Sequence, residues 1–240
     1  MTTPKPRDAG VSHNLVGQRL GRKGRDTRER ILAAAAKLLA EPAGQAITLS
    51  AVAREAALGM TALYLYFRDL SELLGAVLEP VMASVEDAYL VQLRETWPDE
   101  SLGEHTQRFV EAYHAFWARH TTILHLRNLY SDNGDARMRA MRHTGVTPVI
   151  RLIAAQMEAD PKTTDSPAFH MATVLLTGLE RLATVSTDPG FPTMGEPGTP
   201  PRPKDVVDAQ VRKMVRSQAR LLEIAIADGR AASRAEKAGP

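Results

Sequence analysis

Apolar residues recur at helical spacing along most of this chain, whereas stretches that alternate apolar and polar residues are scarce. In the first such segment Ile31, Ala35, Leu38 and Leu39 share one face. An amphipathic helix must bury its apolar face against another element, so a chain of such helices packs helix on helix. The pattern therefore predicts an all-α protein with about nine helices.

Capping residues and helix breakers indicate where these helices begin and end. Asp26 and Glu29 have the spacing of a capping box, and Thr48 can cap a second helix. Pro80 is expected to bend the fourth helix, and Pro148 to interrupt the seventh. The expected helices span about 27–40, 48–57, 60–67, 69–95, 101–119, 121–131, 135–159, 166–186 and 204–228.

Three segments carry no helix signal. Residues 188–205 hold six prolines and three glycines, a composition that excludes helix and sheet and is typical of a mobile connection. The first 20 residues and residues 231–240 are also expected to be disordered.

The composition excludes several classes of protein. There is no cysteine, so disulfides, thiolate metal sites and cysteine nucleophiles are absent. The sequence has no run of 18 apolar residues and does not start with the apolar stretch of a signal peptide, so we expect a cytoplasmic protein without a membrane span. The histidines lack zinc-ligand spacing, and no GxSxG, GxxxxGK, GxGxxG or HExxH motif occurs. We therefore expect no metal, no cofactor and no catalytic residue.

Positive charge is concentrated at the start of the chain. Residues 1–75 contain 11 Lys and Arg against 7 Asp and Glu, whereas residues 76–240 contain 19 against 21. A basic N-terminal segment followed by a neutral or acidic remainder favours a nucleic-acid contact at the N-terminal end. Such a basic segment can also be simply solvated. Arg22 and Lys23 lie between two glycines, with Arg25 next to them. A flexible basic arm of this kind can enter a narrow minor groove or contact phosphates without sequence preference.

Residues 48–67 are typical of a helix–turn–helix unit. Two short helices can cross closely where Ala53 and Ala56 meet, with Leu58, Leu63 and Phe67 filling the space between them. The opposite face of the second short helix carries Thr61, Tyr64, Leu65 and Arg68, at i, i+3, i+4 and i+7. Hydroxyl, phenol and guanidinium groups suit phosphates and base edges. Spacing alone fits two amphipathic core helices equally well.

A longer motif surrounds this unit. It comprises Thr27, Ile31, Leu32, Ala34 or Ala35, Leu39, Thr48-Leu49, Val52-Ala53, Ala56, Leu58, Leu63-Tyr64-x-Tyr66-Phe67, Asp69, Glu72 and Leu73. With this motif, the stretch from Thr27 to about Val77 resembles the DNA-binding domain of tetracycline-repressor-type (TetR family) transcriptional regulators. Beyond residue 80 the resemblance is one of helix count and order.

The resemblance implies a two-fold dimer with an N-terminal DNA-binding domain and an all-helical C-terminal domain that binds a small effector. It divides the chain into a basic disordered arm (1–24), a helix–turn–helix domain (25–77), a ligand-binding and dimerisation domain (78–230) and a disordered tail (231–240). Together with the spacing, it predicts DNA contacts from Arg22, Lys23, Arg25, Thr27, Thr48, Met60, Thr61, Tyr64, Leu65, Tyr66 and Arg68.

The chain departs from the family's pattern at several positions. Relatives often have glycine at Ala57 and a polar residue at Met60, many have glycine at Thr61, and most have lysine at Leu70. That lysine anchors a backbone phosphate, which Leu70 cannot do, so Arg68 is expected to take over the charge. The apolar recognition helix favours contacts with thymine methyl groups.

An aromatic stripe marks the candidate effector pocket. Phe109, Tyr113, Phe116 and Trp117 recur at i, i+4, i+7 and i+8 of one helix. A stripe of this kind is more often plain core, and it is the family's ligand binding that favours a pocket. Few charges interrupt the stripe, so we expect a small, mostly apolar effector. The other expected lining residues are Leu126, Tyr130, Met138, Met141, Ile153, Met157, Met171 and Leu175.

The last two long helices are expected to form a four-helix interface between two copies of the chain. The faces assigned to it carry Phe169, Ala172, Thr173, Leu176, Gly178, Leu179 and Ala183 in 166–186, and Val207, Val211, Met214, Val215, Leu221, Leu222 and Ala225 in 204–228. The resulting hypothesis is a repressor that binds an inverted-repeat operator in double-stranded DNA. Two alternatives remain open: a DNA-binding dimer without an effector, and a small helical enzyme.

Overall fold

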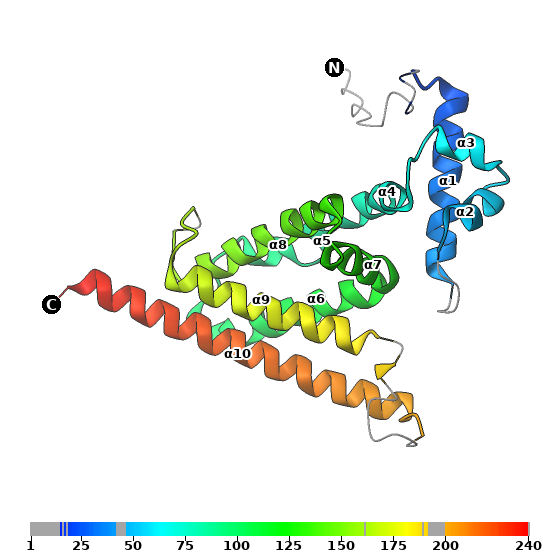
Figure 1. Cartoon of the computed structure of the whole chain (residues 1–240). Helices are drawn as coiled ribbons and strands as arrows, with labels where there is room; N and C mark the ends of the chain where they lie inside the picture. The colour runs from blue at the N-terminus through cyan, green and yellow to red at the C-terminus, as the bar shows by residue number, and fades with distance from the viewer. Residues whose placement is uncertain are drawn as a thin grey trace, which may run out of the picture. The chain divides into compact units, whose positions relative to one another are not determined.

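The computed structural model describes residues 15, 17, 19–41, 47–160, 162–188, 190–191 and 200–239. Within these residues ten α-helices and two short 3₁₀ helices follow one another (Figure 1). The predicted all-α fold is confirmed, with ten α-helices instead of about nine. No helix in these ranges has the length and apolar character that crossing a bilayer requires. The chain divides into two units, Met1–Leu78 and Glu79–Pro240.

Helices α1 (Arg22–Ala40), α2 (Leu49–Glu55) and α3 (Met60–Tyr64) surround an apolar core in the first unit. The Thr48 Oγ1 accepts a hydrogen bond from the Ala51 N–H at 3.1 Å, so the predicted cap of the second helix is confirmed. Helix α4 (Leu70–Ala83) begins in this unit. The buried core residues are Ile31, Ala34, Ala35, Val52, Ala53, Ala56, Leu63, Phe67 and Leu73.

Helix α1 begins earlier than its capping signal predicts. Its N-cap is Gly21, which offers no side-chain hydrogen bond, and Asp26 lies inside the helix. Leu20 is buried, and its carbonyl accepts a hydrogen bond from Arg25 Nη1 at 2.9 Å. These contacts hold the first turn, so Arg22 and Lys23 belong to a helix and not to a flexible arm as predicted. The first 14 residues and residues 42–46 lie outside the described ranges.

Helix α4 ends sooner than predicted. It starts at the expected cap, where Asp69 Oδ1 accepts the Glu72 N–H at 2.6 Å. It includes Pro80 but stops at Ala83 instead of reaching Glu95. Proline removes one backbone donor, and here the helix ends within one turn of it. The following residues form α5 (Val85–Ala88) and the 3₁₀ helix η1 (Leu90–Leu93).

Five long helices make up most of the second unit. They are α6 (Leu102–Arg119), α7 (Thr121–Asp132), α8 (Ala136–Gln156), α9 (Pro167–Ser186) and α10 (Lys204–Ala238), and a short 3₁₀ helix, η2 (Asp99–Ser101), precedes α6. Helix α10 packs along α6 and contacts α9, while α8 packs against α7 and α9. Figure 1 shows α9 and α10 running side by side.

Two long helices continue where the sequence predicts a break. Helix α8 passes through Pro148 without interruption. Helix α10 continues to Ala238, so the predicted disordered tail at 231–240 is wrong for residues 231–238. A set of ion pairs joins this extension to the rest of the unit: Arg234 binds both Asp99 and Glu158, and Lys237 binds Glu158, at 2.9–3.1 Å. These carboxylates come from distant parts of the sequence.

Half of the Pro/Gly-rich connection 188–205 lies outside the described residues. Two of its described residues are joined, because Arg202 Nη2 donates to the Phe191 carbonyl at 3.0 Å and the guanidinium lies over the Phe191 ring. Phe191 itself is buried. The connection is therefore anchored at these two points.

Candidate nucleic-acid interface and effector cavity

Helices α2 and α3 bury one face and expose the other, as the spacing predicts. Ala53, Ala56, Leu63 and Phe67 are buried in the core of the first unit, with Leu58 half-buried beside them. On the outer face Thr61, Tyr64, Leu65 and Arg68 are exposed. Tyr64 has 49% and Leu65 39% of its surface accessible, an unusual exposure for large side chains with apolar surface. This face can meet a ligand without rearrangement.

Three other predicted contact residues are less available. Met60 and Tyr66 are half-buried and pack against the core of the first unit. The Thr48 hydroxyl already accepts the Ala51 N–H and lies 3.0 Å from Ser50 Oγ. Phosphate contacts at these positions would use the parts of the side chains that remain exposed.

The turn between α2 and α3 has the geometry of a Schellman motif. The Leu58 N–H donates to the Ala53 carbonyl at 2.8 Å, and the Ala57 N–H donates to the Arg54 carbonyl at 3.1 Å. Ala57 takes a left-handed backbone conformation with φ of 51°. Glycine adopts this conformation without steric cost, which explains why relatives often have glycine here. The turn fixes the direction in which α3 leaves α2.

Arg68 stands at the end of the exposed face. Its Nε lies 3.3 Å from Glu72 Oε2, and the same carboxylate accepts the Arg68 N–H at 2.8 Å. The side chain is 67% exposed. The carboxylate orients the guanidinium and partly neutralises it, and the guanidinium end stays accessible to a phosphate.

The basic residues ahead of the core lie on and next to the first turns of α1. Arg22, Lys23 and Arg25 are exposed, and the Thr27 hydroxyl donates to the Lys23 carbonyl at 2.9 Å. The Leu15 N–H donates to the Leu65 carbonyl at 3.0 Å, just after α3 ends. The chain before α1 is therefore hydrogen-bonded to the end of the recognition segment. The sequence carries no visible signal for this contact.

A small cavity lies in the second unit beside the aromatic stripe of α6. Its volume is about 10 Å³, enough for one water molecule. Tyr113, Phe116 and Trp117 line it, and Tyr89 packs edge-on against Tyr113 and Phe116 at centroid distances of 5.1 and 5.4 Å. Burial raises the pKa of both phenols, so they stay protonated.

The other predicted lining residues lie elsewhere. Phe109, Met138, Ile153 and Met157 are buried outside the cavity wall. Leu126, Tyr130, Met141 and Leu175 are half-buried. Met171 is 47% exposed on α9, so its assignment to the pocket is wrong. The residues that sequence reasoning missed are Met82, Tyr89, Leu124, Arg127, Gly145, Val146, Val149, Leu176 and Glu180.

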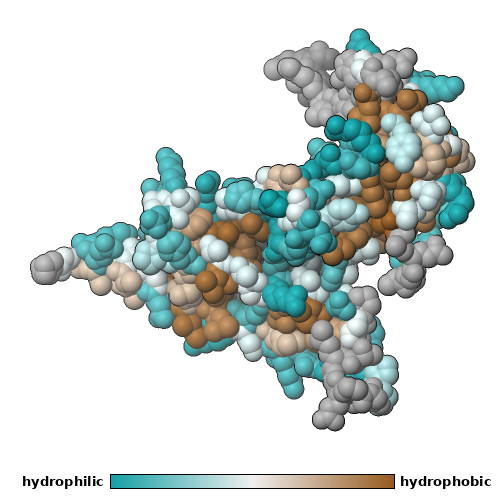
Figure 2. Space-filling view, in the orientation of Figure 1, coloured by the Kyte–Doolittle hydropathy of each residue, from teal (hydrophilic) through white to brown (hydrophobic). Residues whose placement is uncertain are grey.

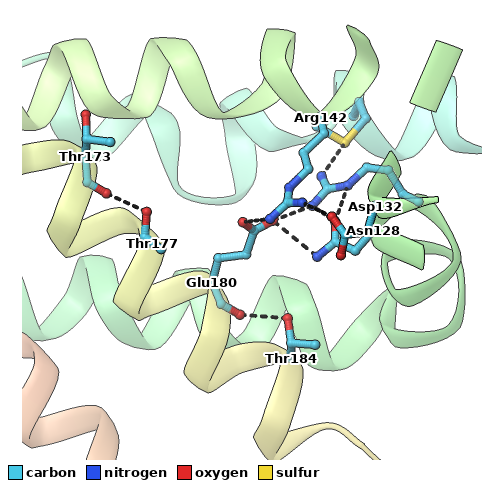
Figure 3. A network of polar contacts seen from close by, with 9 residues as sticks. Asn128, Asp132, Arg142, Thr173, Thr177, Glu180 and Thr184 are labelled. Atoms are coloured by element: carbon cyan, nitrogen blue, oxygen red, sulfur yellow. Dashed lines mark hydrogen bonds and ion pairs between the residues drawn. The ribbon is translucent and has the colours of Figure 1, made fainter. Parts of the chain in front are cut away.

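Two charged side chains, Arg127 and Glu180, also line this cavity, which the expectation of a mostly apolar effector did not include. Arg127 and Glu180 are both buried, and Arg127 Nη2 lies 2.8 Å from Glu180 Oε1. Arg142 Nη2 lies 2.8 Å from Glu180 Oε2, while its Nη1 pairs with Asp132 at 2.9 Å. Figure 3 shows Glu180 and Arg142 pointing toward each other from facing helices. The stripe on α6 is apolar, and the charges come from α7, α8 and α9.

Comparison with known proteins agrees with this geometry. The sequence model described as "Bacterial regulatory proteins, tetR family" matches residues 31–77, the core of the first unit. The N-terminal domain is a tetR-family domain. A crystal structure assigned to a TetR-family transcriptional regulator from Mesorhizobium loti MAFF303099 has a similar fold. The TM-score is 0.51 at 15% sequence identity, over 85% of this chain and 97% of that one. No curated protein matches the chain.

In the second unit, α9 and α10 carry an exposed apolar surface. Ala172, Leu176, Leu179 and Ala183 of α9 are buried within the chain, as are Val207, Val215 and Leu222 of α10, so their assignment to a dimer interface is wrong. The exposed apolar residues alternate with them. They are Met171, Val174, Val206, Leu221 and Ile224. Figure 2 shows apolar side chains among polar ones on the face that α9 and α10 turn toward the viewer.

The histidines form no metal site in the ranges that the structure describes. His114 lies 2.8 Å from Gln218 and His125 lies 2.9 Å from the Thr187 hydroxyl, each pair linking two helices. His105 stacks on Trp97. Their contacts are structural.

Proposed function

We propose that this protein is a transcriptional repressor that binds an inverted-repeat operator as a homodimer and is released by a small effector. The observation that carries the proposal is the exposed face of α3, formed by Thr61, Tyr64, Leu65 and Arg68, within a tetR-family domain. A two-fold dimer presents two such helices to successive major grooves, about 34 Å apart.

The side chains of this face divide between positioning and sequence recognition. Tyr64 and Arg68, with the exposed part of Tyr66, contact phosphates and set the register of α3 in the groove. Thr61 and Leu65 approach base edges, where Leu65 can contact a thymine methyl group. Arg22, Lys23 and Arg25 add phosphate or minor-groove contacts from the start of α1.

Effector binding in the second unit acts through α4. This helix begins at Leu70 in the DNA-binding unit, and its last turn carries Met82, which lines the cavity. An effector that favours one position of α4 changes the separation of the two recognition helices. The two recognition helices then no longer match the spacing of successive major grooves. The effector binds the released state and the DNA-bound state with different affinities, and this difference sets the extent of release.

DNA binding can be tested on the region upstream of the protein's own gene. Fluorescence anisotropy of the labelled DNA at several salt concentrations should show specific binding that persists in the presence of competitor DNA. Arg68→Ala should weaken binding to all sequences and reduce the salt slope by about one, whereas Thr61→Ala should change sequence preference. Arg94→Ala is a matched control, because Arg94 is also exposed and paired with a glutamate, Glu86. If Arg68→Ala leaves affinity and salt slope unchanged, the docking face is wrong.

The nearly closed cavity favours a second candidate, a DNA-binding dimer without an effector. A volume of about 10 Å³ admits no organic ligand unless the cavity opens. Thermal-shift screening separates the two candidates, since a ligand that binds the folded state raises the melting temperature.

A further inference from the structure

The buried guanidinium of Arg127 has more donors than strong acceptors around it. Its Nε and Nη2 donate to Asn128 Oδ1, and Nη2 also donates to Glu180. The acceptor that faces Nη1 is the thioether sulfur of Met82, at 3.8 Å. A thioether is a weak acceptor, and a buried cation hydrogen-bonds far more strongly to an anion.

The hydrogen bonds of Glu180 go to donors other than Arg127 Nη1. Its Oε1 accepts from Arg127 Nη2 and from Asn128 Nδ2, and its Oε2 accepts from Arg142. The two arginines around this one carboxylate give the interior an excess of positive charge, which Asp132 balances only from a largely exposed position. The site can therefore accept one more negative group, at Nη1 of Arg127.

Met82 occupies the position that such a group would take. Its Cε lies against α8 at Gly145, where an added Cβ would come within 2.5 Å of it. The side chain thus spans from the backbone of α8 to the guanidinium of Arg127. Methionine is unbranched and has several rotatable bonds, so it can leave this position without backbone movement.

We propose that the effector is a small aromatic carboxylate that replaces the Met82 sulfur at Arg127 Nη1. The inference rests on the proposed function and specifies its ligand. The aromatic ring of the effector would take the volume vacated by Met82, next to Tyr113, Phe116 and Trp117. The Arg127 guanidinium already lies 5.6 Å from the centre of the Trp117 ring, so charge and ring are recognised side by side.

The same step links the ligand to α4. Met82 is the last residue but one of this helix, so its displacement changes the packing of the turn that ends α4. A neutral ligand of the same shape would lack the charge-assisted hydrogen bond and would compete poorly with the methionine.

The test compares acids with their neutral amides on the full-length protein. The probes are benzoate and phenylacetate against benzamide and phenylacetamide. Binding is followed by the fluorescence of Trp117 in a Trp97→Phe variant, because these are the two tryptophans of the chain. Thermal shift of the wild-type protein gives a second readout. The acids should bind at least about tenfold more tightly than the amides.

Truncation of the methionine supplies the decisive variant. Met82→Ala removes the competitor and enlarges the cavity, so it should tighten acid binding several-fold. Met141→Ala removes the same side chain from α8 away from the cavity wall and should leave acid affinity unchanged. The double variant Arg127→Gln/Glu180→Gln removes one positive and one negative charge, so it leaves the net charge of the cluster unchanged, and it should abolish the preference for acids.

Three results would overturn the inference: equal binding of acids and amides, unchanged acid affinity in Met82→Ala, or no acid binding at all. DNA binding is measured on the same preparations. A protein that binds DNA but no acid refutes the aromatic carboxylate and leaves the repressor proposal intact. A protein that binds acids at Trp117 but no DNA refutes the repressor proposal and leaves the ligand assignment intact.

Discussion

Replacing Ala57 by glycine should stabilise the DNA-binding domain, although it removes a methyl group. Ala57 is exposed, so the methyl group contributes no burial. Its φ of 51° places the backbone in the left-handed region, which costs a residue with a Cβ about 1–2 kcal/mol. Glycine avoids this cost but gives up about 0.4–1 kcal/mol through the greater entropy of the unfolded chain.

With the middle of each range, the net gain from Ala57→Gly is about 0.8 kcal/mol. For a unit of this size that corresponds to a rise in melting temperature of roughly 3–6 °C. Calorimetry and urea unfolding of the full-length protein, followed by far-UV circular dichroism, measure it. The hydrogen bonds of Ala57 and Leu58 to α2 are retained, so DNA affinity should not change.

The control is the same substitution six residues earlier, in a right-handed helical conformation. Ala51→Gly lies in the first turn of α2 and should cost about 0.5–1 kcal/mol. Opposite signs at the two positions would support the argument. If Ala57→Gly destabilises the domain as much as Ala51→Gly, the left-handed turn is not the source of strain.

Two further predictions concern assembly and pH. Val174 is 68% exposed on α9 and should lie in the dimer interface, so Val174→Asp should give a monomer in sedimentation velocity at micromolar concentration. The control Val91→Asp changes a valine that is 50% exposed outside α9 and α10, and this variant should remain a dimer. A wild-type protein that is itself a monomer would contradict the prediction. Burial lowers the pKa of His114, against the opposing effect of the hydrogen bond that it donates to Gln218 Oε1, and burial also lowers the pKa of His120 and His125. Because the unfolded chain then binds protons more readily than the folded one, stability is complete above the ordinary histidine pKa of about 6.5 and decreases as pH falls below it. The melting temperature of the wild-type protein should drop between pH 7.5 and 5.5. The drop should be smaller in His114→Gln and as large as in the wild type in His143→Gln, which changes an exposed histidine. If His114→Gln shows the same drop as the wild type, His114 is not a source of the pH dependence.

The sequence by itself determined the features that depend on neighbours along the chain. The cap at Thr48, the inward set Val52, Ala53 and Leu63, and the outward set Thr61, Tyr64 and Leu65 all follow from helical periodicity and from hydrogen bonds within one turn. The all-α fold and the tetR-family motif belong to the same class of local signal. In each case the residues that decide the structure lie within a few positions of one another.

Only the tertiary structure decided which partners come from distant segments. Arg127 and Glu180 are 53 positions apart and meet across two helices, which placed charge in an interior expected to be apolar. The continuation of α10 to Ala238 depends on carboxylates at Asp99 and Glu158, and the early start of α1 on the buried Leu20. Helical periodicity shows that α9 has apolar residues on two faces, one with Ala172 and Leu176 and one with Met171 and Val174. It does not show which of the two faces is buried within the chain. That choice depends on how α9 packs against α8, α6 and α10, and packing is a property of the folded whole.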